Sequence, residues 1–373
     1  MKKILVMGAG RIGRLLARFL HESPDYDVTL SDTQPILSYQ DGVSVKTTQL
    51  DAANTQNLRA YLADEKINVV VSCLPYFLNQ NVARVAHAVG ITYFDLTEDV
   101  GTTRLVKELA QSSQAAMVPQ CGLAPGFVNI VASDLVEKLD FVDTLALRVG
   151  ALPESSSHPL KYALTWSVDG LINEYCKPCP AIIEGRYHEL TPLEGLENIE
   201  LLNIDLEAFN TSGGIGSLIE TYASRIKNIT YKTLRYPGHA ALMKFLLTDL
   251  NLKDDREVLK KILMNALPES TQDCVYLYVS VKGWVKEKRT EETFIKKYLP
   301  VTLFNEHYSA IAVTTAASCA AVMDLLLQRD HVTKGLVRQE DFSLRDVLAN
   351  RFGRYLGTVD NALYRDSSNE GTP

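Results

Sequence analysis

The glycines near the start of the chain have the spacing of a phosphate-binding turn. The segment Gly8-Ala9-Gly10-Arg11-Ile12-Gly13 follows an apolar run of strand length and precedes apolar residues at helical spacing. In such a turn the first glycine permits a tight bend, the second lets the backbone approach a pyrophosphate, and the third allows close helix–strand packing. The helix N-terminus adds free N–H groups for the phosphates. We therefore expect a dinucleotide to contact Gly8, Gly10, Arg11, Ile12 and Gly13.

An acidic residue follows these glycines where a ribose-binding carboxylate belongs. The predicted strand 28–32 ends at Asp32, about 20 residues past the glycines. A carboxylate there accepts hydrogen bonds from a ribose 2′-hydroxyl and repels a 2′-phosphate, and no arginine follows at positions 33–35. We therefore predict NAD rather than NADP as the cofactor; the alternative is a bare glycine turn with a chance acid after it. Asp51 is either a second contact near the adenine or part of the N-cap region of the next helix.

The loops after two later strands supply the next candidates, because loops at strand C-termini line the ligand crevice of an open parallel sheet. A predicted strand at 67–72 leads into Cys73, Leu74, Pro75 and Tyr76, which we place near the nicotinamide end. Loop packing is the alternative role for Tyr76 and for Phe77 beside it.

A predicted strand at 91–95 delivers two carboxylates to the same edge of the sheet. Glu98 is the first candidate for a general base and Asp99 the second. The alternative for this pair is capping of the helix that follows.

Two segments in the second half of the chain could recognise an anionic substrate. The segment 210–216 combines hydroxyls with glycine N–H groups, the components of a small anion-binding nest, so Thr211, Ser212 and Gly213 are candidates. Arg235 lies in a proline–glycine turn and is suited to bidentate recognition of a carboxylate, with His239 as a neighbouring donor. Ordinary loops are the alternative for both segments.

One cysteine pair has the spacing of a redox or zinc site. Cys176 and Cys179 form a C-x-x-C motif, but no second pair of ligands completes a set of four. We predict that the pair binds no metal.

The pattern of predicted elements indicates an α/β fold. Strands and helices alternate up to residue 139, which is typical of a Rossmann-type, doubly wound parallel sheet. Alternating segments at 144–149 and 274–281 then predict an antiparallel sheet with one exposed face, and the charged segment 283–297 predicts an exposed hairpin or edge. We expect a dinucleotide-binding domain at 1–127, a mixed α+β substrate domain at 128–309, and a return of 310–365 onto the first domain through an apolar helix at 310–327. The expected frayed tail is 366–373.

Composition excludes several classes of partner. The 373 residues include 45 acidic and 38 basic side chains, a net charge of −7, and contain no lysine–arginine run, so nucleic acid is a poor candidate. We predict that no segment approaches the apolar length of a membrane span and that the start is no secretory signal. The 6 cysteines are too few for a disulfide framework in a chain of this length, and we expect a cytoplasmic protein.

Five segments carry a resemblance to a known family. They occur in the order of the glycine fingerprint, Cys121–Gly126, Thr165–Ile172, Phe209–Gly214 and Thr233–His239. Together they resemble the saccharopine dehydrogenase-like family, most closely its lysine 6-dehydrogenase branch, over nearly the whole chain. The resemblance implies a Rossmann domain, a mixed substrate domain that also forms a homodimer or higher homo-oligomer, and a C-terminal return.

The resemblance also assigns roles to particular residues. Arg235 matches the family arginine that holds a substrate carboxylate, and Trp166 and Ser167 match the motif that lines the substrate cavity. Ala124 stands where saccharopine reductases carry an aspartate before the loop proline. That departure weakens saccharopine as the substrate and is compatible with the lysine branch.

We therefore predict NAD-dependent oxidation of the ε-amine of the amino acid L-lysine to a semialdehyde that cyclises. The amine must lose a proton before it loses hydride, and Glu98 or Asp99 would accept that proton and activate the hydrolytic water. One alternative is a reductase that forms a secondary amine, of the saccharopine reductase or carboxynorspermidine dehydrogenase type. A non-enzyme alternative is a dinucleotide-binding sensor that performs no chemistry.

Overall fold

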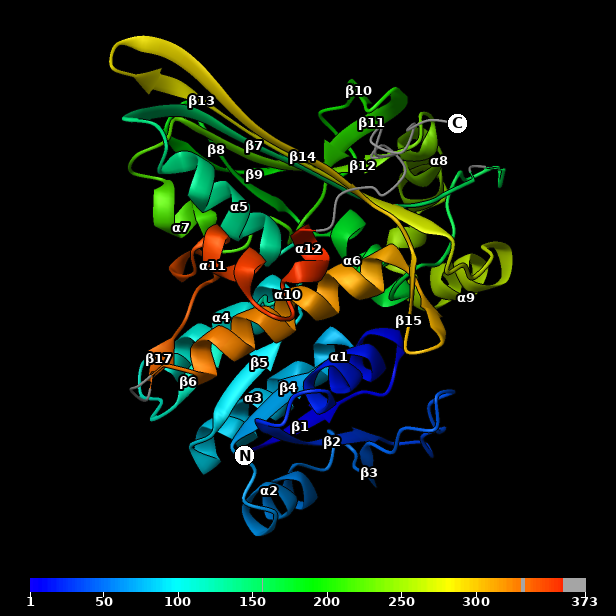
Figure 1. Cartoon of the computed structure of the whole chain (residues 1–373). Coiled ribbons are helices and arrows are strands. Elements are labelled where there is room, and N and C mark those ends of the chain that lie inside the picture. The colour runs from blue at the N-terminus through cyan, green and yellow to red at the C-terminus, as the bar shows by residue number, and fades with distance from the viewer. Residues whose placement is uncertain (156, 330–332, 358–373) are drawn as a thin grey trace, which may run out of the picture.

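The first third of the chain, joined by one short strand from near the other end, forms a parallel sheet with helices on both faces (Figure 1). The computed structural model describes residues 1–155, 157–329 and 333–357, and the predicted tail 366–373 lies outside them. The sheet has 7 strands in the order β17-β6-β5-β4-β1-β2-β3, which confirms the predicted Rossmann fold. The strands are β1 (Lys2–Met7), β2 (Tyr26–Asp32), β3 (Lys46–Gln49), β4 (Val69–Ser72), β5 (Thr92–Asp95), β6 (Ala116–Val118) and β17 (Gly335–Leu336).

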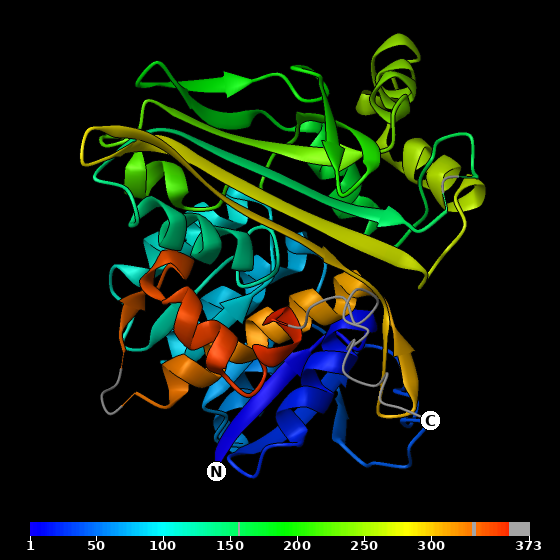
Figure 2. The same cartoon turned by 45° about the horizontal axis from the view of Figure 1, so that its top comes forward.

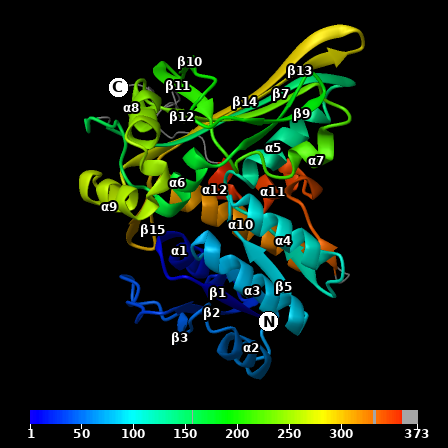
Figure 3. The same ribbon diagram turned by 180° about the vertical axis from the view of Figure 1, so that it is seen from behind.

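The central strands of this domain are continuous apolar runs, because four helices cover the sheet. Every residue of β4 is buried, because helices cover both faces of the sheet. On one face lies α1 (Arg11–His21), and on the other lie α2 (Thr55–Asp64), α3 (Tyr76–Val89) and α4 (Val100–Ala110). Seen from behind, α3 and α4 lie on the face away from α10 (Figure 3).

The second domain is built on a mixed sheet of 8 strands. Its main path runs β10-β11-β12-β7-β13-β14, with β8 and β9 attached to β12. The strands are β7 (Phe141–Pro153), β8 (Cys179–Ile183), β9 (Arg186–Leu190), β10 (Glu197–Leu201), β11 (Ile204–Asn210), β12 (Asn228–Arg235), β13 (Asp273–Val285) and β14 (Lys288–Tyr298). The predicted charged edge is confirmed, because β14 ends the sheet and exposes alternate residues.

The predicted antiparallel pairing of 144–149 with 274–281 is confirmed by β7 and β13, but β7 and β12 run parallel, so the sheet is mixed. A parallel pair requires a long crossover connection. Here the crossover contains α6 (Val168–Cys176) and the β8–β9 and β10–β11 hairpins, and it carries the site-forming helix α6 back across the molecule. The remaining elements are α5 (Phe127–Val136), α7 (Leu218–Tyr222), α8 (His239–Lys244), the π-helix η1 (Phe245–Asp249), the 3-10 helix η2 (Leu252–Asp254), α9 (Arg256–Ala266), β15 (Val301–Leu303) and β16 (Glu306–Tyr308).

The apolar helix α10 (Ala310–Leu327) joins the two domains (Figures 1 and 2). It packs against α1 of the first domain and against β13 of the second, and side chains of all three belong to one buried cluster. By length and composition α10 could cross a membrane, so the prediction that no segment approaches that length was wrong. In this structure 83% of it is buried inside the protein, as in a core helix.

The segment after α10 completes the first domain. It contains the 3-10 helix η3 (Gln339–Asp341), α11 (Leu344–Ala349), α12 (Arg354–Gly357) and the short strand β17, which pairs in parallel with β6. The sequence prediction missed β17 because two residues are too few to show a periodic pattern.

Candidate functional site

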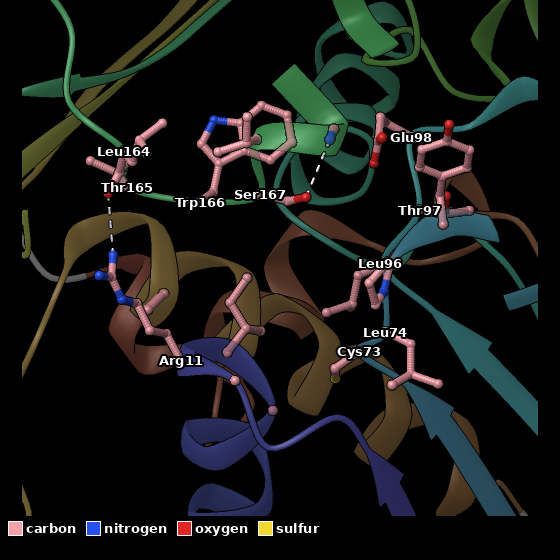
Figure 4. Close-up of a pocket in the computed structure, with 18 of the residues that line it drawn as sticks. Arg11, Cys73, Leu74, Leu96, Thr97, Glu98, Leu164, Thr165, Trp166 and Ser167 are labelled. Atoms are coloured by element: carbon pink, nitrogen blue, oxygen red, sulfur yellow. Dashed lines mark hydrogen bonds between the residues drawn. The ribbon is translucent and has the colours of Figure 1, made fainter. Parts of the chain in front are cut away.

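A cavity of about 440 Å³ opens between the two domains at the carboxyl edge of the parallel sheet. The first domain contributes the start of α1, the loop after β4 and the loop after β5. The segment 164–168 closes it from the second domain. In Figure 4, Trp166 and Ser167 lie on the opposite side of this space from Arg11, Cys73 and Leu74. We call this space the outer cavity.

Gly8 and Gly13 of the fingerprint leave no room for side chains, whereas a Cβ on Gly10 would meet nothing within 4 Å. A Cβ on Gly13 would lie 1.9 Å from the Gly8 carbonyl oxygen, and one on Gly8 would lie 2.8 Å from the Cys73 carbonyl oxygen. Gly8 also has a φ of +100°, which disfavours other residues. The turn therefore brings bare backbone to the cavity, as a bound pyrophosphate requires.

Asp32 ends β2 beside this turn. Its carboxylate accepts the backbone N–H of Ala9 at 2.7 Å and that of Gln34 at 3.2 Å. Partial burial raises the pKa of Asp32, but these backbone hydrogen bonds outweigh it and hold the pKa below its usual value. The glycine turn and this anionic carboxylate together fit a dinucleotide.

Two other predicted cofactor residues, Arg11 and Asp51, form contacts within the protein. The Arg11 guanidinium crosses the outer cavity to Glu269, with Nη2 and Oε2 2.7 Å apart, and to the Leu164 carbonyl at 3.4 Å (Figure 4). Asp51 accepts the backbone N–H of Ala53 in the turn before α2 and does not line the cavity. The turn role, predicted as its alternative, describes Asp51 in this structure.

A second space, the inner cavity, adjoins the first and has a volume of about 120 Å³. The two cavities share Ile12, Leu96, Glu98 and Trp166 in their walls. Deeper in, the polar wall residues are Glu174, Tyr231, Thr233 and Arg235, with Ala124 and Pro125 contributed by the loop after β6. A ligand deep in the inner cavity can therefore extend to Glu98 at the junction.

Arg235, at the end of β12, is buried with a fixed orientation. Nε donates to the Tyr175 hydroxyl at 2.9 Å, and Nη1 donates to the Leu234 carbonyl at 2.9 Å. The guanidinium also lies 5.0 Å from the centre of the Tyr162 ring. Within the described chain Nη2 has no hydrogen-bond partner, so Arg235 can still bind an anion in the cavity that it lines.

His239 supports Arg235 and does not line either cavity. Burial and the charge of Arg235 lower the pKa of His239 to about 3, so the ring is neutral. Nδ1 lies 2.7 Å from the Leu160 carbonyl and must donate to it, which leaves Nε2 to accept from the Tyr175 hydroxyl at 3.0 Å. The prediction of His239 as a direct substrate donor is corrected to a positioning role.

Glu98 is the carboxylate that lines both cavities. Its Oε1 is buried with no hydrogen-bond partner among the described residues. Burial raises the pKa of Glu98 to about 7, and the nearby charges of Asp99 and Asp95 add to the rise. A carboxyl with that pKa can accept and return protons near neutral pH.

Asp99 has a different task. It is the N-cap of α4, where its Oδ2 accepts the backbone N–H of Thr102 at 2.7 Å, and it lines neither cavity. Of the two predicted bases only Glu98 lines the cavities, and the predicted capping alternative describes Asp99. That Glu98 acts as a base stays a prediction.

The loop 211–213 lies behind the cavity wall, which corrects the predicted anion nest. The backbone N–H of Ser212 donates to the Glu174 carbonyl at 3.1 Å, so it is not free for a ligand. A Cβ on Gly213 would lie 2.7 Å from the Glu98 carbonyl oxygen. Ser212 therefore holds the backbone of Glu174 and Gly213 packs against the backbone of Glu98, while the buried Thr211 hydroxyl has no hydrogen-bond partner among the described residues.

Trp166 and Ser167, which the resemblance placed in the substrate cavity, both line the space between the domains, but only Trp166 reaches the inner cavity. Trp166 lines both cavities and donates its indole N–H to the Tyr162 hydroxyl at 2.9 Å. Ser167 lines the outer cavity and caps α6 by accepting the backbone N–H of Gly170.

Sequence reasoning missed Glu174, Tyr162 and Tyr175, which surround Arg235. A signal for Glu174 was present: it is an acid on an otherwise apolar stretch of a helix, next to the Thr165–Ile172 motif. Burial raises the pKa of Glu174 to about 8, although the charge of Arg235 opposes that rise. Both tyrosines are fully buried ring partners of Arg235.

The cysteine pair lies away from both cavities. Cys176 ends α6 and Cys179 begins β8. Across the described ranges, no group of three or more histidine, cysteine, aspartate or glutamate residues is arranged to hold a metal ion. That Cys176 and Cys179 bind no metal stays a prediction.

Comparison with known families finds two matching models. The saccharopine dehydrogenase NADP binding domain matches residues 4–119. The saccharopine dehydrogenase C-terminal domain matches residues 122–357, more than half of the chain.

Curated proteins and one solved structure agree with these matches. Saccharopine dehydrogenase (NADP+, L-glutamate-forming) of Saccharomyces cerevisiae is 22% identical over 379 residues, which cover 92% of this chain and 81% of that protein. The mitochondrial alpha-aminoadipic semialdehyde synthase of Bos taurus is 24% identical over 68% of this chain, and the matched part is 29% of that longer protein. Matches to the rat and mouse synthases likewise cover 21% and 27% of those proteins. The apo saccharopine dehydrogenase structure from S. cerevisiae has a TM-score of 0.69, covers 94% of this chain and 96% of its own, and is 15% identical, a likeness of fold.

Proposed function

The chain belongs to the saccharopine dehydrogenase family, and from this premise we propose that it oxidises the terminal amine of an amino acid, L-lysine, with NAD. One observation carries the proposal. Glu98 lies at the junction between the outer cavity, which is lined by the glycine turn, and the inner cavity, which is lined by Arg235.

Arg235 would hold the α-carboxylate of the substrate. Its Nη2 has no partner in the described chain, while Nε and Nη1 are fixed by Tyr175 and the Leu234 carbonyl. A guanidinium held in this way sets both the position and the direction of a bound carboxylate. An extended amino acid held by Arg235 would place its far end near Glu98.

Glu98 would remove one proton from the terminal ammonium group. A free lysine ammonium has a pKa of about 10.4, so at neutral pH it needs a base in order to react. The neutral amine then loses hydride from its carbon, and water converts the resulting iminium ion to an aldehyde and ammonium. The nicotinamide of the cofactor would accept the hydride. Overall, amine in its ammonium form, NAD+ and water give aldehyde, NADH, ammonium and one proton.

Asp32 supports NAD as the cofactor. It ends β2 as an anion, and Arg14 on α1 donates to the carbonyls of Leu37 and Ser38. A 2′-phosphate would meet the Asp32 charge without a dedicated basic partner. Against this, the matching family domain is described as NADP binding, so the two cofactors must be compared directly.

A reductase that forms a secondary amine is the second candidate. The two S. cerevisiae matches favour it, because both are named saccharopine dehydrogenases that form L-glutamate. Ala124 lines the inner cavity at the position where the resemblance expects an aspartate in saccharopine reductases, and this favours the lysine reaction.

Purified protein assayed in both directions tests the proposal. We expect L-lysine with NAD+ to produce NADH and the cyclised aldehyde. Turnover only when NADPH, an aldehyde and L-glutamate are supplied together would instead assign the reductase reaction. No turnover in either direction, with NADH still bound, would favour the sensor.

A further inference from the structure

Glu174 is a buried carboxylate to which the proposed reaction assigns no role. It lies on α6, is only 6% exposed, and lines the inner cavity with Arg235. In the described part of the chain, no hydrogen bond or ion pair joins its carboxylate to another side chain. Buried polar groups are normally paired, so an unpaired carboxylate facing a cavity calls for a ligand.

The neighbours of Glu174 limit what that ligand is. The charged groups that act on it are Arg235, which favours its ionised form, and Glu98, which opposes it. Arg235 already directs a cationic group into the same cavity. A ligand that satisfies both must carry an anionic and a cationic group close together, and an α-amino acid carries a carboxylate and an ammonium on one carbon.

We propose that Glu174 binds the α-ammonium of the amino-acid substrate while Arg235 binds its α-carboxylate, so that the inner cavity selects zwitterionic α-amino acids. The inference rests on the proposed function and names its substrate class. Glu98 at the junction then meets the second, reacting amine. The cavity as a whole has one carboxylate for each of the two amines of a diamino acid.

The protonation of Glu174 is consistent with this role. Burial raises the pKa of Glu174 to about 8, so its carboxyl is mainly protonated at pH 7 when the site is empty. A bound ammonium would favour the ionised form, and binding would release the proton from Glu174. Burying the neutral carboxyl therefore costs little free energy while the site is empty. The ionised carboxylate attracts the ammonium group when a ligand is bound.

Paired ligands that differ only in the α-amino group test this proposal. The pairs are L-lysine with 6-aminohexanoate and L-glutamate with glutarate, and their binding is followed by calorimetry and by the fluorescence of Trp166 in the cavity wall. The variant Glu174→Gln keeps the side-chain volume and removes the charge. The control Asp169→Asn lies on the same helix, where Asp169 pairs with Lys260 outside both cavities.

We expect the wild type and Asp169→Asn to prefer the α-amino member of at least one pair. In Glu174→Gln that preference should fall on the order of 10- to 100-fold, as for loss of a charge-assisted hydrogen bond, with NADH affinity unchanged. Proton release on binding, measured in buffers of different ionisation enthalpy, should fall as well.

The failure of this proposal differs from failure of the proposed function. An unchanged preference in Glu174→Gln, or no preference in the wild type, would overturn the assignment of Glu174 even if L-lysine is oxidised. If the preference depends on Glu174 but L-lysine is never oxidised, the proposed reaction is wrong and the zwitterion site stands. If Glu174→Gln fails to fold, the wild-type ligand pairs still test whether the inner cavity selects zwitterionic α-amino acids.

Discussion

The outer and inner cavities are built in different ways. The outer cavity presents backbone from the glycine turn, whose residues are contiguous in sequence, beside the loops after β4 and β5 and the segment 164–168. The inner cavity presents side chains from distant segments, with Glu98 after β5, Glu174 on α6 and Arg235 on β12. A site formed by local backbone can tolerate varied side chains around it, whereas a site formed by distant side chains depends on each of them.

This contrast separates the effects of substitutions. Changes in the outer cavity should alter the use of the cofactor, changes in the inner cavity should alter the use of the amino acid, and a change at the junction should alter the reaction itself.

The largest effect is expected at the junction. Glu98→Gln removes the proposed base and should lower kcat by about 10²- to 10⁴-fold, with smaller changes in NADH affinity and KM. Single-turnover and steady-state kinetics with L-lysine measure this loss. Glu108→Gln, an exposed position on α4, is the matched control. A Glu98→Gln enzyme with wild-type kcat would show that another group removes the proton.

Asp32 tests whether the outer cavity alone chooses the cofactor. Asp32→Ala removes the proposed acceptor for the ribose 2′-hydroxyl and the charge that opposes a 2′-phosphate. The ratio of kcat/KM for NAD to that for NADP should fall about 10-fold or more, while KM for the amino acid stays constant. A wild-type preference for NADP would contradict the cofactor assignment.

The pH profile gives a smaller, graded effect. Because the pKa of Glu98 is raised to about 7, the base is lost as pH falls through that value. Below about pH 7, log kcat at saturating L-lysine, where Glu174 is already paired with the bound ammonium, should decline with a slope approaching one per pH unit. Glu98→Gln should abolish this decline in its residual activity. A wild-type profile that is flat down to pH 5.5 would argue against Glu98 as the base.

The smallest expected effect is on stability, at Glu174. Its pKa is raised from 4.5 to about 8 in the folded chain, so the folded state holds a proton that the unfolded state releases over that range. Stability should therefore decrease as pH rises from about 4.5 to 8. Glu174→Gln lacks this term, and its Tm should exceed that of the wild type by more at pH 8.5 than at pH 6. An equal Tm difference at both pH values would contradict the raised pKa.

The same contrast explains what could be predicted from sequence. The positions of Gly8, Gly13 and Asp32 could be predicted from local spacing. In a Rossmann fold the glycine turn after the first strand lies beside the end of the second strand, as it does here. Arg235 also lies in a cavity wall, although its place relied on a family motif rather than on spacing.

The errors arose where a position depended on long-range packing. Residues 211–213 have the composition of a ligand loop, yet their backbone is used to support Glu98 and Glu174. The parallel pairing of β7 with β12 depends on a crossover with no local signature, and that pairing helps bring Arg235 into the wall. Glu174 was missed because an acid on a short helix is ordinarily a surface residue.

The substitution Arg235→Ala tests most directly whether the two cavities divide recognition between them. We predict a loss of about 2–5 kcal/mol in kcat/KM for L-lysine, with an unchanged Kd for NADH, and substantial damage even in Arg235→Lys. Arg148→Ala is the control, because Arg148 is a buried arginine on β7 that pairs with Glu197 and lines neither cavity. If Arg235→Ala instead weakened NADH binding, or oxidised L-lysine as the wild type does, the inner cavity would not be the substrate site.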